Sequence, residues 1–220
     1  MNILRHMAYR DRLKAVLSPA ERKILAKLNS PKKIQDYLDT LPINFEIGKE
    51  TYMSPRRLIQ HKTAHCFEGA LLAAAAFCYH GQKPLLLDLV TIDRDEDHVV
   101  ALFTENGLWG AISKTNHPIL RYRDPVYKSV RELAMSYFHE YIMDDGTKSL
   151  RRFSKPFDLS RYAPEKWVTE EKELDWLVEA LDGSRHFDVA PQKAIRKLRK
   201  ASNLEVRAIN NTEWPSPARG

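Results

Sequence analysis

Cysteine is scarce in this chain of 220 residues, which contains only Cys66 and Cys78. If both lie on one helix they are about 18 Å apart, which is too far for a disulfide bond. The lack of a cysteine framework excludes a disulfide-stapled scaffold, and the chain is long enough to bury a core without staples. Two free thiols are typical of a reducing compartment, so we expect a cytoplasmic protein.

Long apolar runs are also absent, and none reaches the ~18 residues that a membrane-spanning helix requires. Residues 1–12 are polar and basic, without the apolar centre of a signal peptide. The sequence has neither an internal repeat nor a low-complexity stretch. We therefore expect a single globular unit without a membrane span.

The net charge of +6 comes from the two flanks of the chain. Residues 1–60 and 151–220 carry more basic than acidic side chains, whereas residues 61–150 carry more acidic ones. An excess of basic side chains is typical of solvated helix faces. In the basic run 193–200 the apolar residues Ile195 and Leu198 recur at helical spacing, so we expect them to face inward. We expect no nucleic-acid site, although basic flanks also allow weak binding of an acidic partner.

Three Ser-Pro pairs predict helix starts within the first 60 residues. Ser18-Pro19-Ala20-Glu21 is a capping box with proline at the first helical position, and Ser30-Pro31 and Ser54-Pro55 have the same opening. We divide the chain into a helical N-terminal extension over 1–60, a core over 61–160, and a C-terminal helix with a basic tail over 161–220.

Residues 62–81 predict a buried central helix. Thr63 is the expected N-cap, Gly81 follows the last periodic residue, and the interior is rich in Ala and Leu. Cys66 falls in the first turn, where free N–H groups and the helix dipole favour thiolate over thiol. A cysteine nucleophile is the functional interpretation, and a small buried apolar residue is the structural one.

Strand patterns follow the central helix. Residues 84–92, 98–103 and 108–113 are apolar runs, and Glu105-Asn106-Gly107 is a hairpin signal that makes the last two strands antiparallel neighbours. We further expect helices over 125–143 and 164–181, an extended segment over 150–159, and a disordered end to the tail 190–220. A helix followed by a strand meander predicts an α+β fold.

Order along the chain places a thiol and an imidazole on neighbouring elements. Cys66 opens the helix, His98 opens a strand, and Ser113 ends the paired strand. An imidazole facing a thiol can take its proton, and a further polar group on the next strand can orient the imidazole. This layout is typical of cysteine-dependent acyl transfer.

The sequence resembles the transglutaminase-like superfamily over roughly residues 30–125. The segments that carry the resemblance are Thr63-Ala64-His65-Cys66-Phe67-Glu68-Gly69-Ala70, Gly81-Gln82-Lys83-Pro84, Asp97-His98-Val99-Val100-Ala101-Leu102-Phe103 and Gly107-Leu108-Trp109-Gly110-Ala111-Ile112-Ser113. The resemblance implies a papain-type core, in which the Cys-bearing helix packs on an antiparallel sheet. It also implies Cys66 as nucleophile, His98 as base and Gln60 in the oxyanion hole.

The chain departs from this family at the third catalytic position, where Ser113 stands in place of the usual Asp. Asn116 or Asp124 is the alternative orienting group, since Asp97 points to the opposite face of its strand from His98. Loss of an orienting Asp can lower a rate by orders of magnitude. We therefore carry two hypotheses: a cysteine-dependent hydrolase or acyl transferase acting on a protein or peptide amide, and an inactive binding module for an acidic partner.

Metal binding is a weaker interpretation of the same stretch. His61, His65 and Cys66 have ligand chemistry, but they straddle the expected helix start, and the acidic turn 93–97 lacks the spacing of a calcium loop. His65 is also an alternative base, although adjacent residues on a helix diverge by about 100°. We expect neither a metal nor an organic cofactor.

Overall fold

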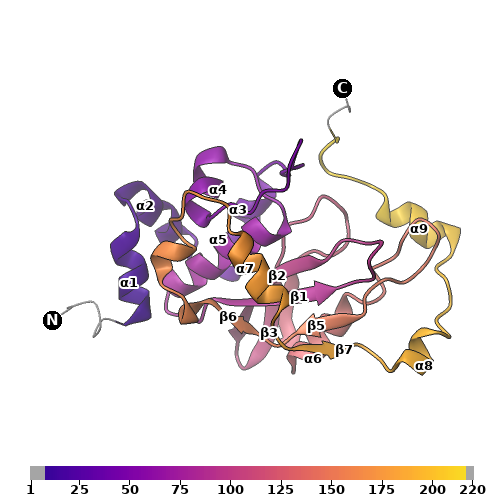
Figure 1. The fold of residues 1–220 in the computed structure, drawn as a ribbon. Helices are drawn as coiled ribbons and strands as arrows, with labels where there is room; N and C mark the ends of the chain where they lie inside the picture. Colours follow the sequence, from indigo (N-terminus) through magenta and orange to yellow (C-terminus); the bar gives the residue numbers. More distant parts are fainter. Residues whose placement is uncertain (1–7, 217–220) are drawn as a thin grey trace.

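The computed structural model describes residues 8–216 of the chain. The helices within them are α1 (Tyr9–Val16), α2 (Pro19–Lys27), α3 (Pro31–Asp39), α4 (Pro55–His61), α5 (Cys66–Tyr79), α6 (Val130–Ser136), α7 (Asp175–Asp182), α8 (Gln192–Ile195) and α9 (Asn203–Ile209). The strands are β1 (Leu85–Val90), β2 (His98–Glu105), β3 (Leu108–Ile112), β4 (Arg123–Tyr127), β5 (Arg152–Ser154), β6 (Phe157–Asp158) and β7 (His186–Asp188). In Figure 1 the first five helices gather on one side of the sheet.

The predicted helix starts at Ser-Pro pairs are confirmed. The Ser18 side chain accepts from the Glu21 N–H, and Glu21 accepts from the Ser18 N–H at 2.7 Å, which completes the capping box. Ser30 and Ser54 likewise accept from the N–H groups at the third positions of α3 and α4. Local side-chain chemistry therefore fixes where these helices begin.

The strands form one antiparallel sheet, so the predicted α+β class is confirmed. Its order is β4-β3-β2-β1-β5-β7, and β6 also pairs with β1. The β2–β3 hairpin turns at Asn106 and Gly107, whose φ values of 52° and 77° are those of the tight turn the sequence predicts. This hairpin aligns Ala101 with Ile112 and thus places the end of β3 beside the start of β2.

Helix α5 lies across one face of this sheet and is buried over Phe67–Cys78. Its first residue is Cys66 and its N-cap is His65, so the expected N-cap at Thr63 is wrong. Thr63 instead donates to the Pro42 carbonyl, while Glu68 accepts from the His65 N–H at 3.0 Å. The buried carboxylate of Glu68 therefore sets the start of the helix.

Each face of the sheet is covered by its own apolar cluster. Leu86 and Phe103 pack with α5 and the N-terminal helices, whereas Leu87 and Leu102 pack with α6 and the residues that follow it. Alternate strand residues serve opposite faces, which explains why β1 and β2 carry apolar residues on both faces. Among residues 8–216, no helix combines the length and apolarity needed to cross a lipid bilayer.

Two predicted helices have different bounds in the structure. The helix expected over 125–143 is strand β4 followed by the shorter α6, because Ser129 caps a helix that begins at Val130. The helix expected over 164–181 is a short 3₁₀ turn followed by α7. Residues 168–174 do not continue it because their backbone bonds to the segment before α4, for example through Leu174 N–H to the Tyr52 carbonyl.

The C-terminal tail is ordered farther than the sequence predicts. Helices α8 and α9 lie within residues 190–216. Disorder was also expected for residues 217–220, which lie outside the described residues. Ile195 and Leu198 pack against the second apolar cluster. The basic run 193–200 therefore uses its apolar stripe for packing, as the helical spacing predicts.

A buried acid–base pair joins β1 to β7. His186 Nδ1–H donates to the Ser184 carbonyl at 2.8 Å, and its Nε2 lies 3.0 Å from Asp88 Oδ2, with both side chains buried. The hydrogen bond to Asp88 raises the pKa of His186, and burial raises the pKa of Asp88. Together the two side chains bind a proton more readily than in the unfolded chain.

The pair gives the fold a pH dependence. A histidine with a raised pKa contributes stability that is fully present below its unfolded pKa of about 6.5 and is lost as pH rises through the folded pKa. We expect His186→Gln to lower the free energy of unfolding by about 3 kcal/mol at pH 6 and by less at pH 9. Urea unfolding at both pH values measures this, and an equal loss at both would contradict it.

Candidate functional site

Cys66 occupies the first position of α5 and is partly exposed. The N–H groups of the first helical turn have no intrahelical acceptor, and the helix dipole adds a positive potential at this end. The neighbouring part of the chain, Ile43 to Glu46, runs beside the helix start through a bridge between Ile43 and Ala64. Cys66 is thus held at the edge of the buried helix, with its thiol facing a cleft.

The cleft has a volume of about 580 Å³. It is formed by residues 43–46, 94–98, 114–120 and 140–144, together with residues 209–210. Its walls carry more carboxylates than cations, the carboxylates being Glu46, Asp95, Glu96, Asp97, Glu140 and Asp144. This charge disfavours an anionic substrate.

His98 is buried at the start of β2 and lines the same cleft. Its Nε2 lies 2.7 Å from the hydroxyl oxygen of Ser113. The Ser113 hydroxyl donates its only proton to the Leu120 carbonyl, so toward His98 the oxygen can only accept. The Nε2 atom must then carry the hydrogen, which leaves Nδ1 as the basic nitrogen of the neutral ring.

The carbonyl that orients Ser113 is itself held in place. Leu120 has a φ of 56°, a left-handed conformation that is costly for a leucine. Its N–H donates to Glu140 Oε2 at 2.7 Å, and Arg123 binds the other oxygen of Glu140 at 2.6 Å. The ion pair therefore fixes the Leu120 peptide, and through it the Ser113 hydroxyl.

Gln35 from α3 holds the backbone of Ser113. Its Nε2 donates to the Ser113 carbonyl at 2.8 Å, and its Oε1 accepts from the Ser113 N–H at 3.1 Å. The next residue, Lys114, is buried and donates to the Leu38 and Leu41 carbonyls near the end of α3. The N-terminal helices thus contribute to the position of the orienting group.

His65, which the sequence suggested only as an alternative base, is the imidazole that the structure places in contact with Cys66. As N-cap it has extended backbone, with φ −99° and ψ −171°, so the 100° divergence expected on a helix does not apply. Its Nδ1 lies 4.0 Å from Cys66 Sγ, and its Nε2–H donates to the Thr51 carbonyl at 2.7 Å. The signal in the sequence was Glu68, three residues after His65, which is the spacing of a capping box.

The two imidazoles act on the same thiol. Burial raises the pKa of Cys66, but the nearby imidazoles of His65 and His98 outweigh it, so the pKa lies well below that of an ordinary thiol. Burial lowers the pKa of His65, yet Cys66, Glu68 and the Thr51 carbonyl raise it to about 9. The site therefore favours a thiolate beside an imidazolium at neutral pH.

The buried carboxylate of Glu68 helps to hold His65 in place beside Cys66. Glu68 accepts from the Met53 N–H at 3.1 Å, from the Asn44 amide, and from the Thr51 hydroxyl, in addition to its bond from the His65 N–H. Its Oε1 lies 3.5 Å from His65 Nε2. Burial raises the pKa of Glu68, while His65 and these hydrogen bonds oppose that rise.

The remaining sequence candidates lie elsewhere. Gln60 is exposed on α4 and does not line the cleft, and Asp124 is exposed on β4. Asn116 lines the cleft, but its side-chain amide bonds to the backbone of Trp214. Asp97 accepts from Thr91, so its carboxylate is turned away from the imidazole of His98. Ser113 is thus the one of these groups that contacts His98.

The described residues show no cluster of three or more His, Cys, Asp or Glu side chains in a metal-binding arrangement. His61, which completed the metal interpretation, is exposed at the end of α4. Only His65 lies next to Cys66, and it contacts the thiol itself. The local geometry is that of a thiol–imidazole pair.

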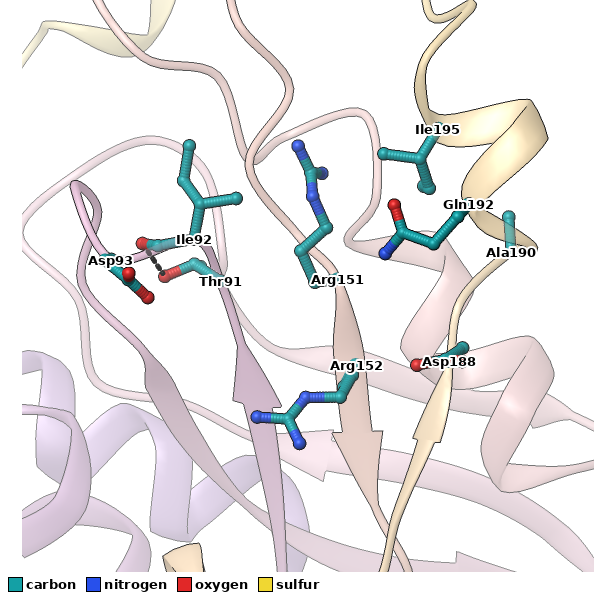
Figure 2. Close-up of a pocket in the computed structure, with 9 residues that line it drawn as sticks. All are labelled: Thr91, Ile92, Asp93, Arg151, Arg152, Asp188, Ala190, Gln192 and Ile195. Atoms are coloured by element: carbon teal, nitrogen blue, oxygen red, sulfur yellow. Dashed lines mark hydrogen bonds between the residues drawn. The ribbon is translucent and has the colours of Figure 1, made fainter.

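A second hollow of about 350 Å³ lies at the ends of β1, β5 and β7 and shares no lining residue with the cleft. Figure 2 shows Arg151 and Arg152 with their guanidinium groups at opposite ends of the hollow. Arg151 donates to the Lys148 and Leu150 carbonyls. The two arginines do not converge on one point, and the residues that line this hollow include no cysteine, serine or histidine.

The proton position on His98 is testable. In Ser113→Ala the acceptor for Nε2–H is lost, so we expect ¹⁵N spectra to show a mixture of ring tautomers in place of the Nε2–H form. A hydrogen bond of about 1 kcal/mol corresponds to a change of roughly fivefold in the tautomer ratio. Ser113→Thr keeps the hydroxyl and should keep the single tautomer. An unchanged spectrum in Ser113→Ala would show that Ser113 does not orient the ring.

No family model matches this chain, and no curated protein matches it in sequence. The chemistry of the site therefore rests on its own geometry: a thiol at a helix start, the His65 imidazole beside it, and a cleft that His98 also lines.

Proposed function

We propose that the chain is a cysteine-dependent hydrolase or acyl transferase that acts on a protein or peptide amide. Cys66 is the nucleophile and His98 the base, within a transglutaminase-like, papain-type core. The observation that carries the proposal is that the Cys66 thiol lies 4.0 Å from the oriented His65 ring, at the wall of a cleft that the oriented His98 ring also lines. A buried structural cysteine has no need of that arrangement.

The proposed reaction begins with attack of the Cys66 thiolate on the amide carbonyl carbon, which forms a C–S bond and an oxyanion. The Cys66 N–H, free at the start of α5, lies where it can donate to that oxyanion. The imidazolium gives its proton to the leaving amine as the C–N bond breaks, which leaves a thioester on Cys66. Water or a second amine then attacks the thioester and releases the thiol.

The two histidines have different parts in this scheme. His98 has a buried ring, with Nε2–H on Ser113 and Nδ1 free to exchange the proton of Cys66. His65 has its Nε2–H on the Thr51 carbonyl and a raised pKa, so it keeps its charge. We assign proton transfer to His98 and electrostatic stabilisation of the thiolate to His65.

The neutral Ser113 sets a limit on the rate. A serine oxygen can select the Nε2–H tautomer, but it carries no negative charge to stabilise an imidazolium. We therefore expect slower acyl transfer than in enzymes that have an Asp at this position.

The same serine favours a second function, a binding module with basic flanks that recognises an acidic partner. This alternative needs no reactive thiol. A thiol with an ordinary pKa, together with salt-sensitive binding to an acidic polymer, would support it.

The proposal predicts a pH profile for alkylation. Iodoacetamide reacts with the thiolate and not with the thiol. The alkylation rate at Cys66 should therefore persist well below the pKa of a free thiol, which is about 8.5. Burial raises the pKa of Cys78 to about 12, which keeps that thiol silent. We expect His98→Ala to lower the rate at pH 6 by about tenfold or more, because the thiol then needs a higher pH to ionise.

A matched control is His80→Ala, which removes a histidine whose Nε2 bonds to the Leu25 carbonyl away from the cleft. Its profile should equal that of the parent chain. His65→Gln should also move the profile to higher pH, and the double variant with His98→Ala should return it to that of a free thiol. Slow alkylation that neither histidine affects would favour the binding module.

Acyl transfer is tested separately with p-nitrophenyl acetate. We expect one equivalent of nitrophenolate to appear in a burst, with the acetyl group found on Cys66 by mass spectrometry. Cys66→Ala should remove the burst, while Cys78→Ala should keep it. A burst that survives in Cys66→Ala would exclude Cys66 as the nucleophile.

A further inference from the structure

The C-terminal segment returns to the cleft after α9. The His117 ring donates from Nδ1 to the Ile209 carbonyl at 3.0 Å, and the Asn210 side chain donates to Asp144 at 3.1 Å. Ile209 and Asn210 line the cleft that contains Cys66. In Figure 1 the chain leaves α9 and continues past the loops at that end of the sheet.

Asn116 binds the backbone of this segment in the way that a neighbouring strand would. Its side-chain Nδ2 donates to the Trp214 carbonyl at 3.0 Å, and its Oδ1 accepts from the Trp214 N–H at 2.8 Å. Its own carbonyl accepts from the Glu213 N–H at 2.9 Å. Three hydrogen bonds thus go to main-chain atoms, which every residue type offers except for the N–H of proline.

One side chain adds selectivity to this contact. Arg121 binds the Glu213 carboxylate at 2.8 Å, and Arg121 is itself held by the His117 carbonyl. Glu213 and Trp214 lie in a bend, where the N–H and the carbonyl of Trp214 both bond to the Asn116 side-chain amide. The contact therefore recognises a peptide main chain with a carboxylate side chain in the position of Glu213.

The loop that carries these groups begins directly after Ser113. Asn116 and His117 line the cleft together with Cys66 and His98. Ile209 and Asn210 of the bound segment line it too, whereas the residues that pair with Asn116 lie just beyond its wall. Extended peptides commonly bind by pairing their main chain with a protein backbone or a backbone-like amide. A nucleophile beside such a contact is suited to act on the bound chain.

We propose that the loop around Asn116 and Arg121 is a peptide-binding subsite for the reaction of Cys66, and that the chain's own C-terminal segment occupies it. The inference rests on the proposed function for the role of the bound peptide as substrate, but peptide binding itself needs no reactive thiol. The occupying segment is tethered, so its effective concentration is about millimolar. It must leave before an external peptide pairs with Asn116.

The test uses the full-length chain and a fluorescein-labelled peptide with the sequence of residues 208–216. Trp214→Pro removes the N–H that donates to Asn116, and it restricts the residue before it, so the segment should be released. Trp214→Phe is the matched control because it keeps the backbone bonds. We expect fluorescence anisotropy to show at least about tenfold tighter peptide binding to Trp214→Pro than to Trp214→Phe.

Asn116→Ala in the Trp214→Pro chain should abolish the gain, and Arg121→Gln should weaken binding several-fold. Equal binding to the two Trp214 variants, or binding that ignores Asn116→Ala, would overturn the proposal. In a second measurement, on the chain without changes at Trp214, Asn116→Ala should speed hydrogen exchange at the Trp214 amide, and unchanged exchange would count against the contact.

The outcomes separate the two proposals. Peptide binding through Asn116 with an unreactive Cys66 would retain the subsite and reject the proposed acyl transfer. A reactive Cys66 with no peptide binding by the Trp214→Pro chain would reject the subsite and retain the nucleophile.

Discussion

The buried carboxylate of Glu68 is the interaction on which the site depends. It gathers donors from Asn44, Thr51 and Met53 and also binds the His65 N–H. A buried carboxylate without such partners would be very costly, so these bonds tie the segment before α4 to the start of α5. The same bonds fix His65 as N-cap and Cys66 as the first helical residue, and thus determine which groups the thiol faces.

The second constraint is the hydrogen-bonded series from His98 to the Ser113 hydroxyl and on to the Leu120 carbonyl. Ser113 accepts from the imidazole because the Leu120 carbonyl takes its proton, and Leu120 is held by Glu140 and Arg123. A neutral hydroxyl can therefore do what a carboxylate does for the tautomer, though it adds no charge. The geometry suits a thiolate that is stabilised mainly by neighbouring imidazoles, of which His65 has a pKa raised to about 9 and is charged at neutral pH.

The sequence predicted those features that depend on local chemistry. Ser18, Ser30 and Ser54 start helices through their own side chains, and Asn106-Gly107 closes the hairpin that brings Ser113 to His98. The start of α5 was misplaced because Thr63 has the better N-cap residue type, while the deciding group, Glu68, works through contacts with a distant loop.

Long-range backbone contacts explain the other differences. The helix expected over 164–181 is shortened because residues 168–174 bond to the segment before α4. Asn116 was a candidate for orienting His98, but its amide pairs with Trp214, which is 98 residues away along the chain. Neither contact has a signature in the local sequence, since main-chain groups are the partners in both.

The central claim is that Cys66 is a thiolate at neutral pH, and its absorbance near 240 nm tests this most directly. The difference between the parent chain and Cys66→Ala, followed as pH is lowered from 9, reports ionisation of that one thiol. The account predicts that the thiolate signal is retained at pH 7 and lost only well below the ordinary thiol pKa of about 8.5. A signal that disappears near or above pH 8.5 would contradict it, and Cys66 would then be a structural residue.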